Sequence, residues 1–215
     1  MADNRKTPSD HVLAVVKAGI NVVPVVGGPL ANLIGDYVPN STQRAAVRTM
    51  ELLAEKLSSL EDRIDVQQVD KEEFSELFKS CSLVVIRSHR EEKLRVAAAL
   101  LANLLLRPSD AKKSPYEELD HLVRCLETLS VGAIAVLGAS RHITAAQANF
   151  NLDPLRNLFP EFDTSLLMSL VRELENLNLL RVQEGNIRMS DHGELLLELT
   201  PIGRRFVERF IEGDM

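Results

Sequence analysis

The most restrictive feature of this sequence is an apolar segment at residues 12–38, VLAVVKAGINVVPVVGGPLANLIGDYV, in which only Lys17 and Asp36 are charged. Its length approaches that of a membrane span, which needs about 20 consecutive apolar residues. However, Pro24 and the Gly-Gly-Pro run that follows it interrupt any helix near the middle of the segment. The pattern therefore predicts two short helical arms that form a tight apolar hairpin.

Two interpretations of this hairpin stay open. Soluble domains hide large apolar surfaces, so the hairpin is expected to pack as a buried scaffold under a neighbouring helix. Alternatively, a hairpin with so few charges leaves the bundle and contacts a membrane or a partner protein, with its backbone groups bonded within helices. The residues expected to make that contact are Val22, Val23, Val25, Val26, Gly27, Gly28 and Leu30.

Composition favours helices for the rest of the chain. Of the 215 residues 45% are hydrophobic but only 4% are aromatic, and there is no Trp. A core built mainly from Leu, Val and Ala is typical of helical proteins, so we expect a mostly α fold in one large or two small domains. The net charge of −6 gives no chain-wide attraction for nucleic acids, so such a role would require a local basic patch.

A long amphipathic helix is expected after Pro39. Its apolar residues recur at alternating spacings of four and three, the a/d pattern of a helix that packs against other helices. These residues are Ala46, Met50, Leu53, Leu57, Leu60 and Ile64. The packing partner is either another helix of the same chain or a second copy of the protein.

Three capping boxes, each a short polar residue followed three positions later by Glu, predict further helix starts. They are Asp70 with Glu73, Ser88 with Glu91, and Ser114 with Glu117. The polar stretch RPSDAKK at residues 107–113 contains a helix breaker and is typical of a linker. We therefore expect a helical bundle with the hairpin at residues 1–107 and a second module at residues 114–215.

The second module follows the order of a winged helix. Apolar helices are predicted at residues 115–129, 131–137, 152–159 and 163–179, and a strand follows at 180–183. A Glu-Gly-Asn turn leads to a second predicted strand at 195–199, and Pro201 begins a last helix. Helices followed by a β-ribbon and a final helix indicate a winged-helix-like module with a small β-ribbon.

A winged helix suggests DNA binding, with one helix in the major groove and the ribbon against the phosphates. Between Asp163 and Glu194, however, three arginines face six acidic residues, which gives a local charge of −3. Specific DNA binders commonly make about 6–10 phosphate contacts through Lys and Arg. The charge pattern therefore favours a protein partner. The residues that would contact nucleic acid in the alternative interpretation are Arg172, Asn176, Arg181 and Arg188.

No motif indicates catalysis, a cofactor, a metal site or a small-molecule substrate. The Gly-Gly pair at Gly27 is followed by Pro and Leu, so it is not a nucleotide-binding loop. The five histidines are scattered singly, and Cys81 and Cys125 lack a second Cys at metal-ligand or redox-motif spacing. We therefore expect a non-enzymatic chain in a reducing cytosol, without a secretory leader.

Several segments resemble bacterial abortive-infection alpha proteins. They are EFSELF at residues 73–78, KLRVAAALLANL at 93–104, LDHLVRCLETLS at 119–130, LENLNLL at 174–180 and LTPIGRRF at 199–206. The resemblance implies a bacterial protein, cytosolic or peripheral to the inner membrane, with a part in phage defence. It provides no catalytic residues to transfer.

Taken together, these patterns predict a non-enzymatic interaction or effector protein. The winged-helix part is expected to bind protein, and the hairpin with the long helix to support self-association or membrane contact. A DNA-binding transcriptional regulator that uses Arg172, Asn176 and the β-ribbon is the alternative.

Overall fold

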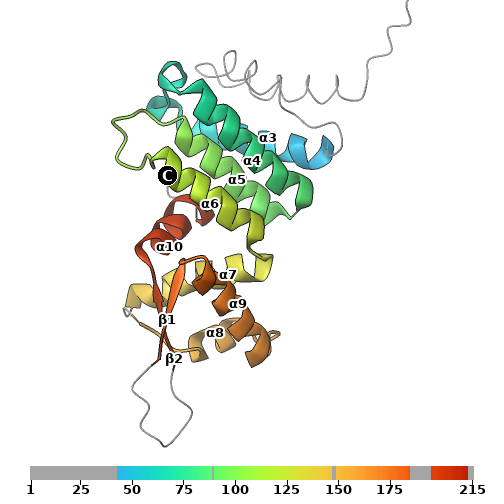
Figure 1. Ribbon diagram of the computed structural model, residues 1–215, viewed down its shortest axis with the longest axis vertical. Coiled ribbons are helices and arrows are strands. Elements are labelled where there is room, and N and C mark those ends of the chain that lie inside the picture. Colours follow the sequence, from blue (N-terminus) through green and yellow to red (C-terminus); the bar gives the residue numbers. More distant parts are fainter. Residues whose placement is uncertain (1–42, 89, 147–148, 185–194, 213–215) are drawn as a thin grey trace, which may run out of the picture. The chain divides into compact units, whose positions relative to one another are not determined.

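The structure is a computed structural model that describes residues 43–88, 90–146, 149–184 and 195–212 (Figure 1). It is mostly helical, with a two-stranded antiparallel hairpin near the C-terminus, which confirms the predicted mostly α class. No helix within these ranges is both long enough and apolar enough to cross a bilayer.

By their packing, the described residues form two compact units that divide between Glu127 and Thr128. The predicted module boundary at residues 107–114 stays a prediction. In the structure, the helix that follows it packs with the first unit. In particular, the Tyr116 hydroxyl donates to Glu76 at 3.0 Å and the Lys93 ammonium donates to the Glu127 carbonyl at 3.3 Å.

The first unit is built around a central helix. Its described elements are α3 (Gln43–Ser59), η1 (Glu61–Arg63), η2 (Val66–Gln68), α4 (Lys71–Arg87), α5 (Glu91–Leu104) and α6 (Tyr116–Thr128). Helix α5 lies beside both α3 and α4, and every residue from Val96 to Leu104 is buried. Four alanines in this stretch permit close helix approach, while Phe74, Phe78 and Leu100 fill the surrounding core.

The a/d stripe of the long helix packs within the same chain. Met50, Leu53 and Leu57 are buried where α3 contacts α5 and α4, so this stripe already has its helical partners. The helix ends at Ser59, earlier than the pattern predicts, and the last two positions of the stripe lie on the turns that follow. Ile64 then forms an antiparallel bridge with Leu106.

The capping predictions have different outcomes. Asp70 is the N-cap of α4, where its carboxylate accepts from the backbone N–H groups of Glu72 at 2.8 Å and Glu73 at 3.1 Å. The Ser88 box is wrong, because α5 begins after Arg90, which makes no side-chain cap hydrogen bond. Ser88 instead ends α4, and its backbone N–H donates to the Val84 carbonyl at 2.9 Å.

At the Ser114 box, α6 begins at Tyr116. However, the Ser114 N–H, which a capping box would pair with Glu117, donates to the Asn103 side chain at 2.8 Å, and the Ser114 hydroxyl donates to Glu118 at 3.3 Å.

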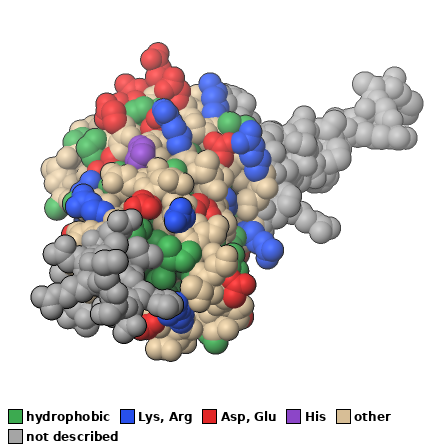
Figure 2. Space-filling model, turned by 60° about the horizontal axis from the view of Figure 1, so that its bottom comes forward, with side chains coloured by type: hydrophobic (Ala, Val, Ile, Leu, Met, Phe, Trp, Pro, Cys, Tyr) green, Lys and Arg blue, Asp and Glu red, His purple; other side chains and the backbone are tan. Residues whose placement is uncertain are grey.

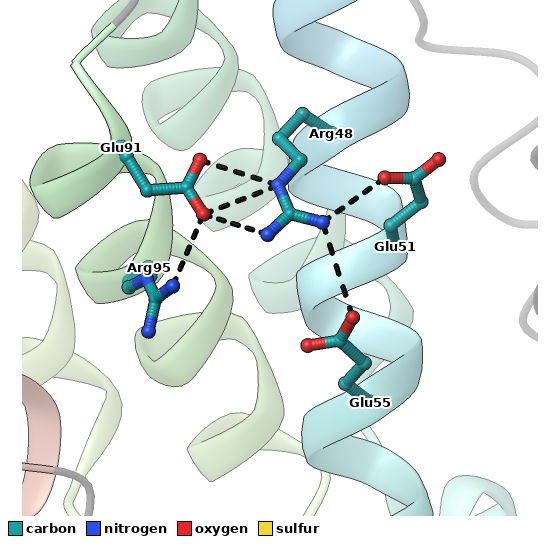
Figure 3. A network of polar contacts seen from close by, with 5 residues as sticks. All are labelled: Arg48, Glu51, Glu55, Glu91 and Arg95. Atoms are coloured by element: carbon teal, nitrogen blue, oxygen red, sulfur yellow. Dashed lines mark hydrogen bonds and ion pairs between the residues drawn. The ribbon is translucent and has the colours of Figure 1, made fainter.

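Glu91 instead belongs to a cluster of ion pairs between α3 and α5 (Figure 3). The Arg48 guanidinium donates from Nε to Oε2 of Glu91 at 3.2 Å and from Nη2 to Oε1 at 2.7 Å, which is a bidentate pair. Glu51, Glu55 and Arg95 complete the cluster. The hydrogen bond to Arg48 lowers the pKa of Glu91, and the hydrogen bond to Glu91 raises the pKa of Arg48.

The loop between α5 and α6 is fastened to the first unit by buried polar groups. The Asn103 amide donates to the Lys112 carbonyl at 2.9 Å and accepts from the Ser114 N–H at 2.8 Å. The Lys113 ammonium donates to the carbonyls of Leu104 at 2.9 Å and Leu106 at 2.7 Å, which satisfies the end of α5. Burial lowers the pKa of Lys113.

Asp110 makes this loop sensitive to acid. The Arg63 guanidinium donates to both Asp110 oxygens at 2.7 Å and lowers the pKa of this carboxyl from 3.8 to about 2, while the Asp110 side chain is only 11% exposed. A pKa depressed by folding gives stability that is present above about pH 4 and is lost as the pH falls toward 2. We expect Asp110→Asn to cost about 1–2 kcal/mol at pH 6 and almost nothing near pH 2, measured by urea unfolding at both pH values.

Asp62→Asn, at an exposed position beside Arg63, is the matched control and should leave this pH dependence unchanged. An Asp110→Asn cost that is the same at both pH values would contradict the ion-pair explanation.

The second unit keeps the predicted order of elements. Its described elements are α7 (Val131–Ala146), α8 (Asp153–Leu158), α9 (Thr164–Asn176), β1 (Leu180–Glu184), β2 (Leu195–Leu199), α10 (Pro201–Phe206) and the π-helical turn η3 (Val207–Ile211). Helix α7 continues well beyond the predicted end at Leu137.

The two strands pair in register from Leu180 opposite Leu199 to Glu184 opposite Leu195.

Strand β2 is bonded on both of its edges. On one edge Leu197 lies opposite Val182 of β1, and on the other it forms an antiparallel bridge with Phe150. The Phe150 N–H donates to the Leu197 carbonyl at 3.0 Å, and the Leu197 N–H donates back at 2.7 Å. Phe150, which precedes α8, thus makes a one-residue bridge beside the two-stranded ribbon. Phe150, Leu197 and Phe206 are buried in the core of this unit.

A tight corner joins α9, β1 and α10. Asn178 follows α9 with φ of 55°, a left-handed conformation that Asn tolerates at a helix end. The Thr200 hydroxyl donates to the Asn178 carbonyl at 2.7 Å and accepts from the Gly203 N–H at 3.0 Å, which caps α10. Gly203 packs so closely that a Cβ built on it would lie 1.8 Å from the Leu179 carbonyl oxygen.

Candidate functional site

The predicted contact residues of the apolar hairpin, Val22, Val23, Val25, Val26, Gly27, Gly28 and Leu30, lie outside the described residues. Arg188, one of the predicted nucleic-acid contacts, lies outside them as well. The described candidate residues are therefore those on α9 and the ribbon of the second unit.

Helix α9 has one buried face and one polar, exposed face. Leu167, Leu170, Val171 and Leu174 are buried, at the spacing of one side of a helix. On the opposite side, four exposed polar residues recur at spacings of four, three and four. They are Ser165, Ser169, Arg172 and Asn176. Two of the predicted nucleic-acid contacts, Arg172 and Asn176, therefore share this face.

Arg181, the third described candidate for nucleic-acid contact, lies on the ribbon, and its charge is offset by a neighbouring carboxylate. It lies on β1 directly opposite Glu198 of β2, and its guanidinium is 3.8 Å from the Glu198 carboxylate. Across a strand pair such opposite charges largely cancel at longer range. On the face shown in Figure 2, the Lys and Arg side chains are separate points between acidic, apolar and neutral groups, rather than one continuous basic field.

Glu173 corrects the local charge count made from the sequence. Its carboxylate is turned toward the start of α7, where it accepts from the backbone N–H and, at 3.0 Å, from the hydroxyl of Ser130. Ser130 in turn accepts from the Ala133 N–H at 3.1 Å and so caps α7. Glu173 is thus a structural acceptor, and the outward surface of α9 is less acidic than the count suggests.

The turn between α8 and α9 carries an apolar surface that sequence reasoning missed. Leu158 at the end of α8 is 55% exposed, and Leu166 in the first turn of α9 is 43% exposed. Between them, the rings of Phe159 and Phe162 stack with their centroids 5.4 Å apart, and both are partly exposed. We call these four residues the α8–α9 apolar surface.

Acidic groups lie within this short segment. Glu161 is exposed between the two phenylalanines, and Asp163 is the exposed N-cap of α9, whose carboxylate accepts from the Leu166 N–H at 2.7 Å. Among the described residues, neither carboxylate has a basic partner within 4 Å. Asp153 of α8, by contrast, is paired with Arg156 at 2.8 Å.

The sequence did contain a signal for this surface. The buried stripe of α9 accounts for Leu167 and Leu170, and Leu166 falls outside it by one position. An apolar residue off the buried stripe of an amphipathic helix is either exposed or contacts a further element. Leu158 carries no such signal, because α8 is too short to define a periodic face.

Neither cysteine has the environment of a reactive thiol. Cys81 and Cys125 are buried, and burial raises the pKa of Cys81 and raises that of Cys125 to about 11, so both stay protonated at neutral pH. The Cys125 sulfur is 3.5 Å from His121 Nε2, one helical turn away. Within the described part of the chain, no group of three or more His, Cys, Asp or Glu residues is arranged to hold a metal ion.

Comparison of the chain with protein-family models, curated proteins and solved structures finds no significant match.

Proposed function

We propose that this chain is a non-enzymatic interaction or effector protein whose second unit is a winged-helix module that binds another protein. The order of α7, the Phe150 bridge, α8, α9 and the β1–β2 ribbon supports the winged-helix assignment. In that fold the helix in the position of α9 is the one that reads a ligand, chiefly through its N-terminal part.

The chemistry at the N-terminal end of α9 carries the proposal. Leu166 is exposed in its first turn, and the carboxylates of Glu161 and Asp163 lie just before it. A helix that entered a DNA groove would bring these two carboxylates toward phosphates and would desolvate DNA against Leu166. Both effects oppose a polyanion, whereas exposed apolar groups with a polar rim are typical of protein interfaces.

The wider role that we propose is the one that the sequence resemblance implies. The protein would act in bacterial phage defence, in the cytoplasm or at the inner membrane, and the apolar hairpin would provide membrane contact or self-association. Helix α3 is the less suitable element for self-association, since its apolar stripe already contacts α4 and α5.

DNA binding is the second candidate, because one observation favours it. The exposed face of α9 presents Ser165, Ser169, Arg172 and Asn176, and Arg and Asn are among the residues that read base edges. A regulator of this kind would lose affinity steeply with salt and on Arg172→Ala.

A photo-crosslinking experiment distinguishes the two candidates. A photoreactive amino acid replaces Leu166 in the full chain, which is expressed in bacterial cells, and the adducts are digested separately with nuclease and with protease. We expect a discrete adduct that protease removes and nuclease does not, and its yield should fall at least about 5-fold with Leu158→Ser, a fall equivalent to roughly 1 kcal/mol.

The same photoreactive group at Ala135, an exposed position on α7, is the matched control and should give neither adduct. A nuclease-sensitive adduct at Leu166, lost on Arg172→Ala, would replace our proposal with the DNA-binding regulator.

A further inference from the structure

We propose that the α8–α9 apolar surface docks an amphipathic helix of another protein, one whose apolar residues are flanked by Lys or Arg. This inference rests on the proposed function and specifies the partner's chemistry. Its basis is the combination of exposed leucines with unpaired carboxylates in one segment of nine residues, from Leu158 to Leu166.

The apolar part of the proposal rests on four large side chains that are exposed or partly exposed within this segment. Leu158 and Leu166, 55% and 43% exposed, are the two ends of the segment, and the stacked rings of Phe159 and Phe162 lie between them. Stacked aromatic rings are rigid and lose little entropy on binding, which is why aromatic residues are frequent at binding hot spots. A row of leucines on one helix face is a common way for a partner to cover exposed apolar side chains of this kind.

The acidic residues beside the α8–α9 apolar surface determine which charges are favourable next to the apolar row of a partner. Asp153 on the neighbouring α8 is paired with Arg156, whereas Glu161 and Asp163 have no basic partner among the described residues and supply the uncompensated charge of the segment. The positive end of the α9 dipole offsets part of the Asp163 charge, whereas Glu161 precedes the helix. Lys or Arg beside the apolar row of a partner would therefore be attracted, and Asp or Glu in the same places would be repelled.

The same charges argue against two other occupants. In a symmetric pair of copies, each α8–α9 apolar surface would face itself, and Glu161 and Asp163 would approach the same carboxylates of the second copy. A bacterial inner membrane carries a negative surface potential, which would repel these carboxylates as well.

Two synthetic peptides test the proposal. Both form the same amphipathic helix with a row of leucines, but one has Lys and the other Glu at the positions that flank this row. Each carries a fluorescent label, and binding to the full chain is followed by anisotropy at 50 and 200 mM salt. We expect the Lys peptide to bind at least about 10-fold more tightly than the Glu peptide, with a preference that shrinks as salt rises.

Variants locate the binding site. Leu158→Ser should weaken the Lys peptide at least about 10-fold, and Glu161→Lys combined with Asp163→Asn should remove or reverse the charge preference. Asn keeps the capping oxygen, so α9 should stay intact in that variant. Glu175→Lys, which makes a similar charge change at an exposed residue near the other end of α9, is the matched control and should leave the preference unchanged.

Equal binding of the two peptides, binding of neither, or a charge preference that Glu175→Lys alters as much as the double variant would each overturn the inference. The proposed function fails separately, because it depends on whether the crosslinked adduct at Leu166 is a protein, whatever the charge of that protein.

Discussion

Gly203→Ala is expected to destabilise the protein by at least about 3 kcal/mol and to lower its melting temperature by about 10 °C or more. The added Cβ would lie 1.8 Å from the Leu179 carbonyl oxygen and 2.7 Å from the carbonyl carbon. Both are backbone atoms in the corner that Thr200 and Asn178 hold by hydrogen bonds, so the overlap cannot be relieved by a side-chain rotation. Thermal unfolding followed by circular dichroism measures the effect.

Gly138→Ala is the matched control on α7 of the same unit. Its Cβ would lie 3.8 Å from the nearest heavy atom, Ile211 Cγ2, which is an ordinary contact distance. Alanine is favoured over glycine inside a helix by up to about 1 kcal/mol, so this variant should be as stable as the parent or slightly more stable. Equal losses in the two variants would show that the corner is not the cause.

Phe74→Ala is expected to cost about 3–5 kcal/mol, the usual range for a large side chain removed from a packed core. Phe74 is completely buried in the first unit, and its ring stacks on that of Phe78 with the centroids 6.0 Å apart. The cavity would lie between helices that already pack closely around the alanines of α5, so they can collapse into it only in part. Urea unfolding gives the change in the free energy of unfolding.

Leu83→Ala on the same helix provides the comparison. Leu83 is 46% exposed, so its truncation creates no cavity and should cost less than about 1 kcal/mol. A cost for Phe74→Ala no larger than that of Leu83→Ala would mean that α4 does not pack against α5 as described.

Local signals predicted most of the second unit. Asp163 and Pro201 mark the starts of α9 and α10, and the structure has them as the N-cap residue and the first helical residue. The two ribbon strands begin and end within one residue of their predicted positions, because each is a short segment whose bounds are marked by residues of the chain itself. Gly185 and Asn186 of the predicted turn lie outside the described residues.

Contacts between distant residues could not be predicted in this way. The Ser88 box was wrong because Glu91 binds Arg48, 43 residues earlier, instead of turning back to its own helix end. Likewise, Glu173 was counted as surface charge, although it accepts hydrogen bonds from Ser130, the residue 43 positions earlier that caps α7. The candidate surface was missed for a related reason: the exposure of Leu158 depends on how a one-and-a-half-turn helix packs, which no periodic pattern records.

The corner around Gly203 also bears on how relatives of this chain should be sought. Gly203 satisfies a steric requirement at the Leu179 carbonyl and Thr200 caps α10, so a chain that turns from a ribbon into a helix in the same way would favour Thr and Gly at these positions for folding alone. Sequence identity at these positions therefore indicates a similar backbone turn and carries little information about common ancestry or function. Exposed positions with no folding duty, such as Leu158 and Glu161, are the ones whose recurrence in another genome would indicate a shared role.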